Sequence, residues 1–189
     1  MVRQSEERRV IKGTMVIDVV KTIKGFRDIN WNQFLSPQAQ ELFSQKILPS
    51  NWYPFEPVLS CITAIYKILG KGDPGAARAW GKINSKRLFE TTYKNVVAPG
   101  APLRSLEKLA LIISTNFFHG MKFEVEQRGG QHLHVEVHDD DPRTEPVYYF
   151  ILGWLDALSE SMPGVNIKAE IVKKHWQGDP VTVLDIRWE

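Results

Sequence analysis

Three histidines and one glutamate alternate with apolar residues along a short segment, at His132, His134, Glu136 and His138. In a β-strand every second side chain points to the same face, so these four share one face about 7 Å apart. Two imidazoles at that spacing could ligate one metal ion, as paired strand histidines do in zinc sites. The alternative is a solvated face with charge pairs across the sheet, involving Lys122, Glu124, Glu126, Lys168 and Glu170. We favour the solvated face and expect no metal.

The other residues that could do chemistry are scattered. His119 is expected at the end of a helix, where a cation complements the helix dipole, and His175 in an exposed turn. The acidic loop 139–145 lacks the ligand spacing and glycine turn of a calcium site. Residues 70–75 are rich in glycine but lack the order of a phosphate-binding loop, and no nucleophile-elbow or dinucleotide fingerprint occurs. A binding or regulatory module is therefore favoured over an enzyme.

Composition narrows the class of protein. The 24 basic and 22 acidic residues leave a net charge of +2, which gives no electrostatic case for nucleic acid. Cys61 is the single cysteine, so no internal disulfide forms, and its apolar surroundings predict a buried thiol. The first ten residues lack the apolar core of a signal peptide, and no run of eighteen apolar residues occurs. We expect a cytoplasmic protein without a membrane span.

Helical spacing dominates up to about residue 118. The apolar residues of segment 15–25 recur on one helical face, with Thr14 as the expected N-cap and Gly25 as the end. Ser36-Pro37 combines an N-cap with a proline at the first helical position, and the helix it begins is expected to end before Pro49. An aromatic turn is expected at 51–57, and further helices over 58–70, after Asp73-Pro74 and over 103–118.

The apolar period changes from 3.6 to 2 near residue 120. Alternation on both sides of the turn 128–131 predicts a β-hairpin with one apolar and one polar face. An apolar helix is expected over 145–160, and strands over 165–171 and 181–188. The residues expected to face the helices are Phe123, Val125, Leu133, Val135, Val137 and Ile167. The predicted fold class is α+β, in one domain (1–189) with a helical half (about 14–118) and an antiparallel ββαββ half (about 119–189).

This order of elements resembles one superfamily. It contains the haem-nitric-oxide-binding domains, the vinyl-reductase-type ligand-binding domains and the Bet-type subunits of the TRAPP transport complex. More narrowly, the chain is similar to an uncharacterised paralogous family of myxobacteria and related deltaproteobacteria. That similarity covers nearly the whole chain and rests on short motifs, namely VIKGT at 10–14, WYP at 52–54, AARAWG at 76–81 and FETT at 89–92.

The resemblance implies an apolar ligand between helices and sheet, or dimerisation through a helical face. The haem-binding branch carries an iron-ligating histidine on the helix before the first strand, but segment 103–118 has none before His119. It also carries a Tyr-x-Ser-x-Arg signature on the second strand, which here reads HLHVEVHD from His132. On these departures we judge against haem and expect no cofactor.

Two functions stay open at this stage, beside an enzyme of unknown class. The first is a sensory or regulatory module with an apolar small molecule in a pocket lined by Trp52, Tyr53, Phe118 and Trp154. The second is a homodimerisation or signalling-partner module without a ligand, in which the same aromatic residues only fill the core. An elongated apolar pocket would favour the first function, and an exposed apolar patch would favour the second.

Overall fold

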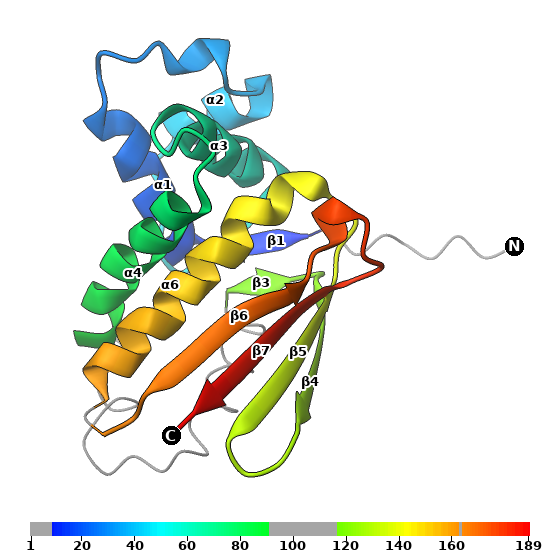
Figure 1. Ribbon diagram of the computed structural model, residues 1–189. Coiled ribbons are helices and arrows are strands. Elements are labelled where there is room, and N and C mark those ends of the chain that lie inside the picture. The colour runs from blue at the N-terminus through cyan, green and yellow to red at the C-terminus, as the bar shows by residue number, and fades with distance from the viewer. Residues whose placement is uncertain (1–8, 91–116, 163) are drawn as a thin grey trace, which may run out of the picture.

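The computed structural model describes residues 9–90, 117–162 and 164–189 of the chain. The expected α+β class is confirmed. The larger of the two sheets has four strands, and Figure 1 shows helices against one of its faces and a second group of helices beyond one end of it. The helices are α1 (Gly13–Gly25), α2 (Pro37–Ser44), α3 (Phe55–Ile68), α4 (Pro74–Glu90) and α6 (Glu145–Ser161), with short 3₁₀ turns at Trp31–Gln33, Pro142–Thr144 and His175–Gln177.

The structure confirms two of the three helix starts predicted from the sequence. The Ser36 hydroxyl accepts a hydrogen bond from the Ala39 amide, as expected of an N-cap, although α2 ends at Ser44. Asp73 caps α4 through the amide of Gly75. Thr14 is not the cap of α1, because the chain passes directly from strand β1 into the helix and Lys12 occupies the N-cap position.

A small sheet was not predicted from the sequence. Strands β1 (Val10–Lys12), β2 (Trp52–Pro54) and β3 (Phe118–His119) pair in the order β2-β1-β3, all antiparallel. Two or three residues are too short for a visible alternation of apolar and polar side chains. The expected turn at 51–57 is therefore partly strand. His119 lies in β3 instead of at a helix end, while most of the helix expected over 103–118 lies outside the described residues.

The large sheet has the order β4-β5-β7-β6, with every neighbouring pair antiparallel. Its strands are β4 (Lys122–Gln127), β5 (His132–His138), β6 (Ile167–Lys173) and β7 (Thr182–Trp188). Leu133, Val135, Val137 and Ile167 are buried as predicted. Val125 pairs with Val135 but is 37 % exposed, because β4 is an edge strand.

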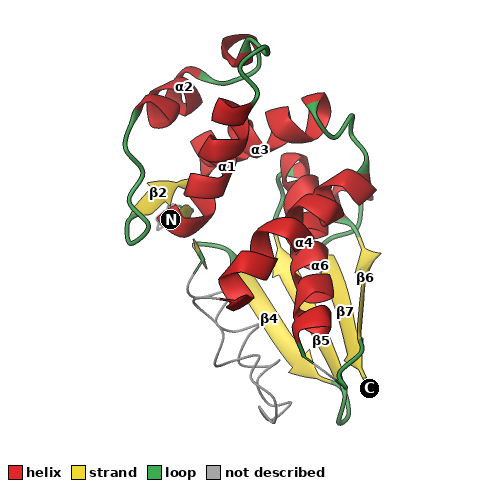
Figure 2. Cartoon of the chain, turned by 90° about the vertical axis from the view of Figure 1, so that its left-hand side faces the viewer, coloured by secondary structure: helices red, strands yellow, loops and turns green. Residues whose placement is uncertain are grey.

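Helix α6 packs on the sheet, and α4 lies along α6 (Figure 2). Gly81 of α4 and Gly153 of α6 let the two backbones touch, since a Cβ on either would overlap a carbonyl oxygen of the other helix. The guanidinium group of Arg78 on α4 donates a bidentate pair of hydrogen bonds to the carboxylate of Asp156 on α6, at 2.6 and 2.7 Å, and this reinforces the contact. Within the described ranges, none of the helices combines the length and hydropathy needed to cross a bilayer.

Candidate functional site

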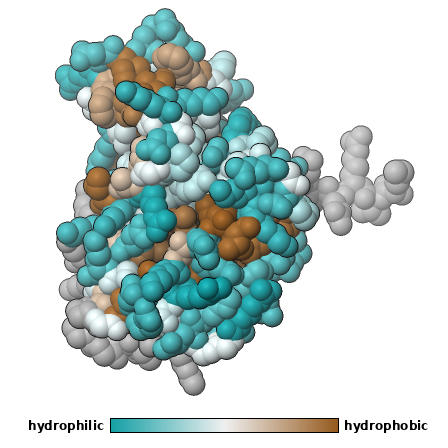
Figure 3. Space-filling model, in the orientation of Figure 1, coloured by the Kyte–Doolittle hydropathy of each residue, from teal (hydrophilic) through white to brown (hydrophobic). Residues whose placement is uncertain are grey.

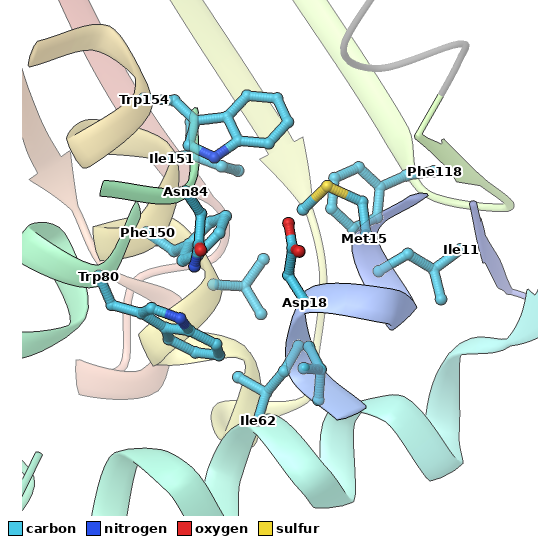
Figure 4. A pocket seen from close by; sticks show the side chains of 12 residues that line it. Ile11, Met15, Asp18, Ile62, Trp80, Asn84, Phe118, Phe150, Ile151 and Trp154 are labelled. Carbon is cyan, nitrogen blue, oxygen red and sulfur yellow. The ribbon is translucent and has the colours of Figure 1, made fainter. Parts of the chain in front are cut away.

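A small apolar cavity lies between two groups of helices, α1 and α3 on one side and α4 and α6 on the other, next to the small sheet (Figure 4). The centre of a water molecule can reach about 30 Å³ of it. That is room for about two waters at roughly 10–15 Å³ each. The lining comes from β1, α1, α3, α4, β3 and α6, and consists of Ile11, Met15, Asp18, Val19, Ile62, Trp80, Asn84, Phe118, Val147, Phe150, Ile151 and Trp154.

Helical spacing explains how one face of α6 forms a wall of this cavity. Val147, Phe150, Ile151 and Trp154 follow the i, i+3, i+4, i+7 pattern of a single helical stripe. Phe150 lies 5.9 Å from the ring of Trp154 and 5.1 Å from that of Trp80 on α4. These aromatic contacts fix the wall in place.

Two buried hydrogen-bond donors in the lining lack a partner. The indole Nε1 of Trp154 and the amide Nδ2 of Asn84 are both shielded from solvent and make no hydrogen bond in the described part of the chain. Leaving a buried donor unpaired costs on the order of 1–3 kcal/mol. Figure 4 also shows the Asp18 carboxylate pointing into the cavity. A water or a ligand with an acceptor group would satisfy the two donors, which makes this cavity the candidate site.

The four aromatic residues proposed for a pocket separate into two pairs. Phe118 and Trp154 line the cavity. Trp52 and Tyr53 do not, because β2 pairs with the outer side of β1 and carries them away from it. Trp52 packs on His119 at 4.0 Å, and the Tyr53 hydroxyl accepts a hydrogen bond from the Leu48 amide at 2.8 Å. Ligand binding at any of these residues stays a prediction.

Several lining residues were missed from the sequence. The stripe on α6 was visible as helical spacing, but nothing indicated which neighbour it would face. Asp18 and Asn84 carried a usable signal, since a polar residue beside the apolar face of a helix often marks a contact with something other than core.

The strand histidines lie on the sheet face opposite α6, as their alternation predicted. His134 is buried, with Nδ1 2.9 Å from Asp185 Oδ1 and Nε2 3.2 Å from Glu136 Oε1. Nε2 of His132 lies 3.2 Å from the same Asp185 oxygen, but without the alignment of a hydrogen bond. Nε2 of His138 lies 3.3 Å from Glu124 Oε1 on β4.

Asp185 is the charge that holds two of these histidines. Burial alone would raise the pKa of its carboxyl group. The hydrogen bond from His134 and the neighbouring His132 outweigh burial, so that the pKa lies below its ordinary value. Asp185 is therefore ionised at neutral pH and accepts the hydrogen bond from His134 as a carboxylate.

The fold and its cavity define the class of α+β domains in which helices enclose an apolar space beside an antiparallel sheet. No model of a protein family matches the sequence, and no curated protein matches it. The fold is shared with H-NOX domains. It matches an H-NOX protein from S. oneidensis in the Fe(II)NO ligation state over 95 % of this chain and 99 % of that one, with a TM-score of 0.61 and 13 % identity.

Two further solved structures show the same fold. A point mutant of the T. tengcongensis H-NOX matches over 95 % of this chain and 97 % of that one, with a TM-score of 0.56 and 19 % identity. An oxygen-binding H-NOX domain related to soluble guanylate cyclases matches over 95 % of each chain, with a TM-score of 0.56 and 18 % identity. The expected resemblance to the haem-nitric-oxide-binding superfamily is thus confirmed at the level of the fold.

The expectation of no cofactor is contradicted by these comparisons. The similar structures include an H-NOX protein in the Fe(II)NO ligation state, an oxygen complex of an H-NOX domain, and a structure described as modulating haem redox potential through porphyrin distortion, all of which point to haem. Judging against haem was wrong because it rested on two short motifs. The two motifs concern only the residues that would contact the iron and the propionates of a haem. Whether the helices enclose a space for a ligand depends on the fold instead.

The cavity lining can be compared with what a haem requires. Among the described lining residues, Met15 alone carries a side chain of a type that ligates haem iron in cytochromes. None of them is a cation that could pair with propionates. The apolar and aromatic walls suit a flat ring, but the present space of about 30 Å³ is far smaller than a haem. A haem would fit only if the cavity opened.

Proposed function

We propose that the protein is a sensory or regulatory module that binds an apolar small molecule in the cavity between the two groups of helices. The observation that carries this proposal is the pair of unpartnered buried donors, Trp154 Nε1 and Asn84 Nδ2, in an otherwise apolar lining. Asp18 is the one ionisable side chain among the described lining residues. The cavity therefore lacks the paired acid and base of most hydrolytic sites, which favours binding over catalysis.

Haem is the first ligand to test, because the domains that share this fold are described with haem iron and its gaseous ligands. In this chain the Met15 thioether would be the iron ligand that the described lining offers, and Trp154 and Asn84 would be its polar neighbours. Bound haem would supply an iron atom able to take up a diatomic gas. The protein's own residues would hold the ring and exclude water.

The test begins with native mass spectrometry of the purified full-length chain, which reports any ligand that copurifies, followed by titration with haemin. We expect a saturable Soret shift at one equivalent that changes in Met15→Ala. The matched control is Met121→Ala, a half-buried methionine outside the lining, which should leave the spectrum unchanged. Absence of any copurified ligand together with non-saturable haemin binding would overturn the proposal.

The alternative is a dimerisation or signalling module without a ligand. It is supported by the large apolar side chains that the region around α2 exposes, with Phe26 49 %, Phe34 50 % and Leu48 42 % accessible. Figure 3 shows a hydrophobic patch over this region. Sedimentation that shows a monomer at high micromolar concentration would argue against it. We also propose that the protein belongs to the narrower deltaproteobacterial family, that it is located in the cytoplasm, and that the chain forms a single domain.

A further inference from the structure

The exposed face of the large sheet brings two carboxylates and an imidazole together. Glu124 on β4 lies directly across from Glu136 on β5, and His138 follows Glu136 by two residues on the same face. One ligand-type atom from each of the three lies within 4.8 Å of the other two. Like charges directly opposite each other destabilise an antiparallel pair, so a cation between Glu124 and Glu136 would stabilise the sheet here.

We propose that Glu124, Glu136 and His138 bind one zinc-type transition-metal ion. Zinc takes nitrogen and carboxylate oxygen at about 2.0–2.2 Å, which places tetrahedral ligand atoms roughly 3.4 Å apart. The separation of 3.3 Å between His138 Nε2 and Glu124 Oε1 already fits one edge of that tetrahedron. The Glu136 carboxylate lies within 4.8 Å of the other two ligand atoms, and its partly exposed side chain can close the remaining separation by rotation.

A second histidine holds Glu136 in place. His134 is 8 % exposed, and its Nε2 lies 3.2 Å from Glu136 Oε1 while its Nδ1 lies 2.9 Å from Asp185 Oδ1. If Oε1 is held by His134, the second carboxylate oxygen can turn toward the metal. Carboxylates that ligate metals are commonly fixed by such hydrogen bonds, and loss of these neighbours weakens binding about 10–100-fold. This buried, hydrogen-bonded histidine distinguishes the site from an ordinary cluster of surface acids.

The neighbouring lysine and the types of the three ligands determine which metal ion can bind. Lys122 forms an ion pair with Glu124 at 2.5 Å, and both side chains are largely exposed. Exposed pairs of this kind contribute little, so a divalent ion can displace the lysine. The imidazole disfavours Mg²⁺ and Ca²⁺, which prefer six or more oxygen ligands.

The test is a titration of the full-length chain, without an affinity tag, with Zn²⁺ by isothermal calorimetry. We expect one equivalent to bind, with Glu136→Gln and His138→Ala each weakening the affinity at least tenfold. Mg²⁺ should give no signal. Glu126→Gln is the matched control, because Glu126 lies on the same strand and face as Glu124, opposite His134, but outside the three ligands. It should change the affinity less than twofold.

Two results would overturn the proposal. One is the absence of saturable Zn²⁺ binding in the folded wild-type chain. The other is an equal loss of affinity in Glu136→Gln and Glu126→Gln, which would show general attraction to a polar face. All of these side chains except His134 lie at least partly at the surface, so circular dichroism should confirm that the variants fold. The outcome does not depend on the ligand of the cavity.

Discussion

Replacing Gly153 by alanine is expected to destabilise the protein, because α4 and α6 touch backbone to backbone at this residue. A Cβ at position 153 would overlap the carbonyl oxygen of Arg78 and lie 2.6 Å from the amide nitrogen of Lys82. Both obstacles are backbone atoms of α4, which cannot rotate away as a side chain would. The helices would have to separate.

The magnitude follows from two opposing effects. Inserting a methyl group into a packed contact costs about 1–3 kcal/mol, and the rigid backbone here places the cost near 3 kcal/mol. Alanine is the better helix former by about 1 kcal/mol, which offsets part of the loss. The net loss of unfolding free energy is about 2 kcal/mol. For a chain of this length it lowers the midpoint of thermal unfolding by roughly 4–8 °C.

The assay is thermal unfolding followed by circular dichroism, with Gly25→Ala as the control. Gly25 ends α1, and a Cβ there would meet nothing within 4 Å. Gly25→Ala should leave the midpoint unchanged or raise it by a few degrees. If Gly153→Ala unfolded at or above the wild-type midpoint, the close helix crossing would be refuted.

Three further outcomes are expected. Val135→Asp should cost several kcal/mol as an unpaired buried charge, whereas Val125→Asp, its partly exposed partner across the ladder, should cost much less in the same thermal assay. Burial tends to raise the pKa of Asp141, but hydrogen bonds from Arg143 lower it below its ordinary 3.8. Its stabilising effect is thus present above pH 3.8 and lost as the pH falls further, so Arg143→Met should destabilise by about 1 kcal/mol at pH 7 and progressively less below pH 4 in pH-dependent unfolding. Burial raises the pKa of the Cys61 thiol to about 12, so alkylation by iodoacetamide should follow unfolding, and rapid labelling of the native protein would contradict this.

The sequence predicted those parts of the fold that repeat a period over enough residues. The hairpin 121–138 and the helix over 145–160 each carry several turns or alternations, and both were located to within a few residues. The small sheet was missed because β3 is two residues long and its partners come from distant parts of the chain. Gly81 was noted only as part of the AARAWG motif, and Gly153 of α6 was not noted, since their contacts exist only after the helices cross.

The candidate site was less predictable for a related reason. Phe118 and Trp154, which line the cavity, were proposed because large aromatic side chains need extensive packing, and that requirement is local. Trp52 and Tyr53 were proposed on the same ground but lie outside the lining, because their packing is supplied by His119 and the backbone near Leu48. The cavity is a gap between two groups of helices, and its extent depends on how they meet.

The wall of the cavity formed by α4 and α6 is fixed by more close contacts than the wall formed by α1. This difference predicts how the cavity opens for a larger ligand. The wall formed by α4 and α6 is fixed by the two glycine contacts and by ion pairs of Arg78 with Asp156 and Lys82 with Glu160, each at 2.6 Å. The opposite wall belongs to α1, which meets α3 and the small sheet. Displacing α1 therefore breaks fewer tight contacts than separating α4 from α6. On addition of haemin, amide hydrogen exchange should change most in α1, and a change confined to α4 and α6 would contradict this mode of opening.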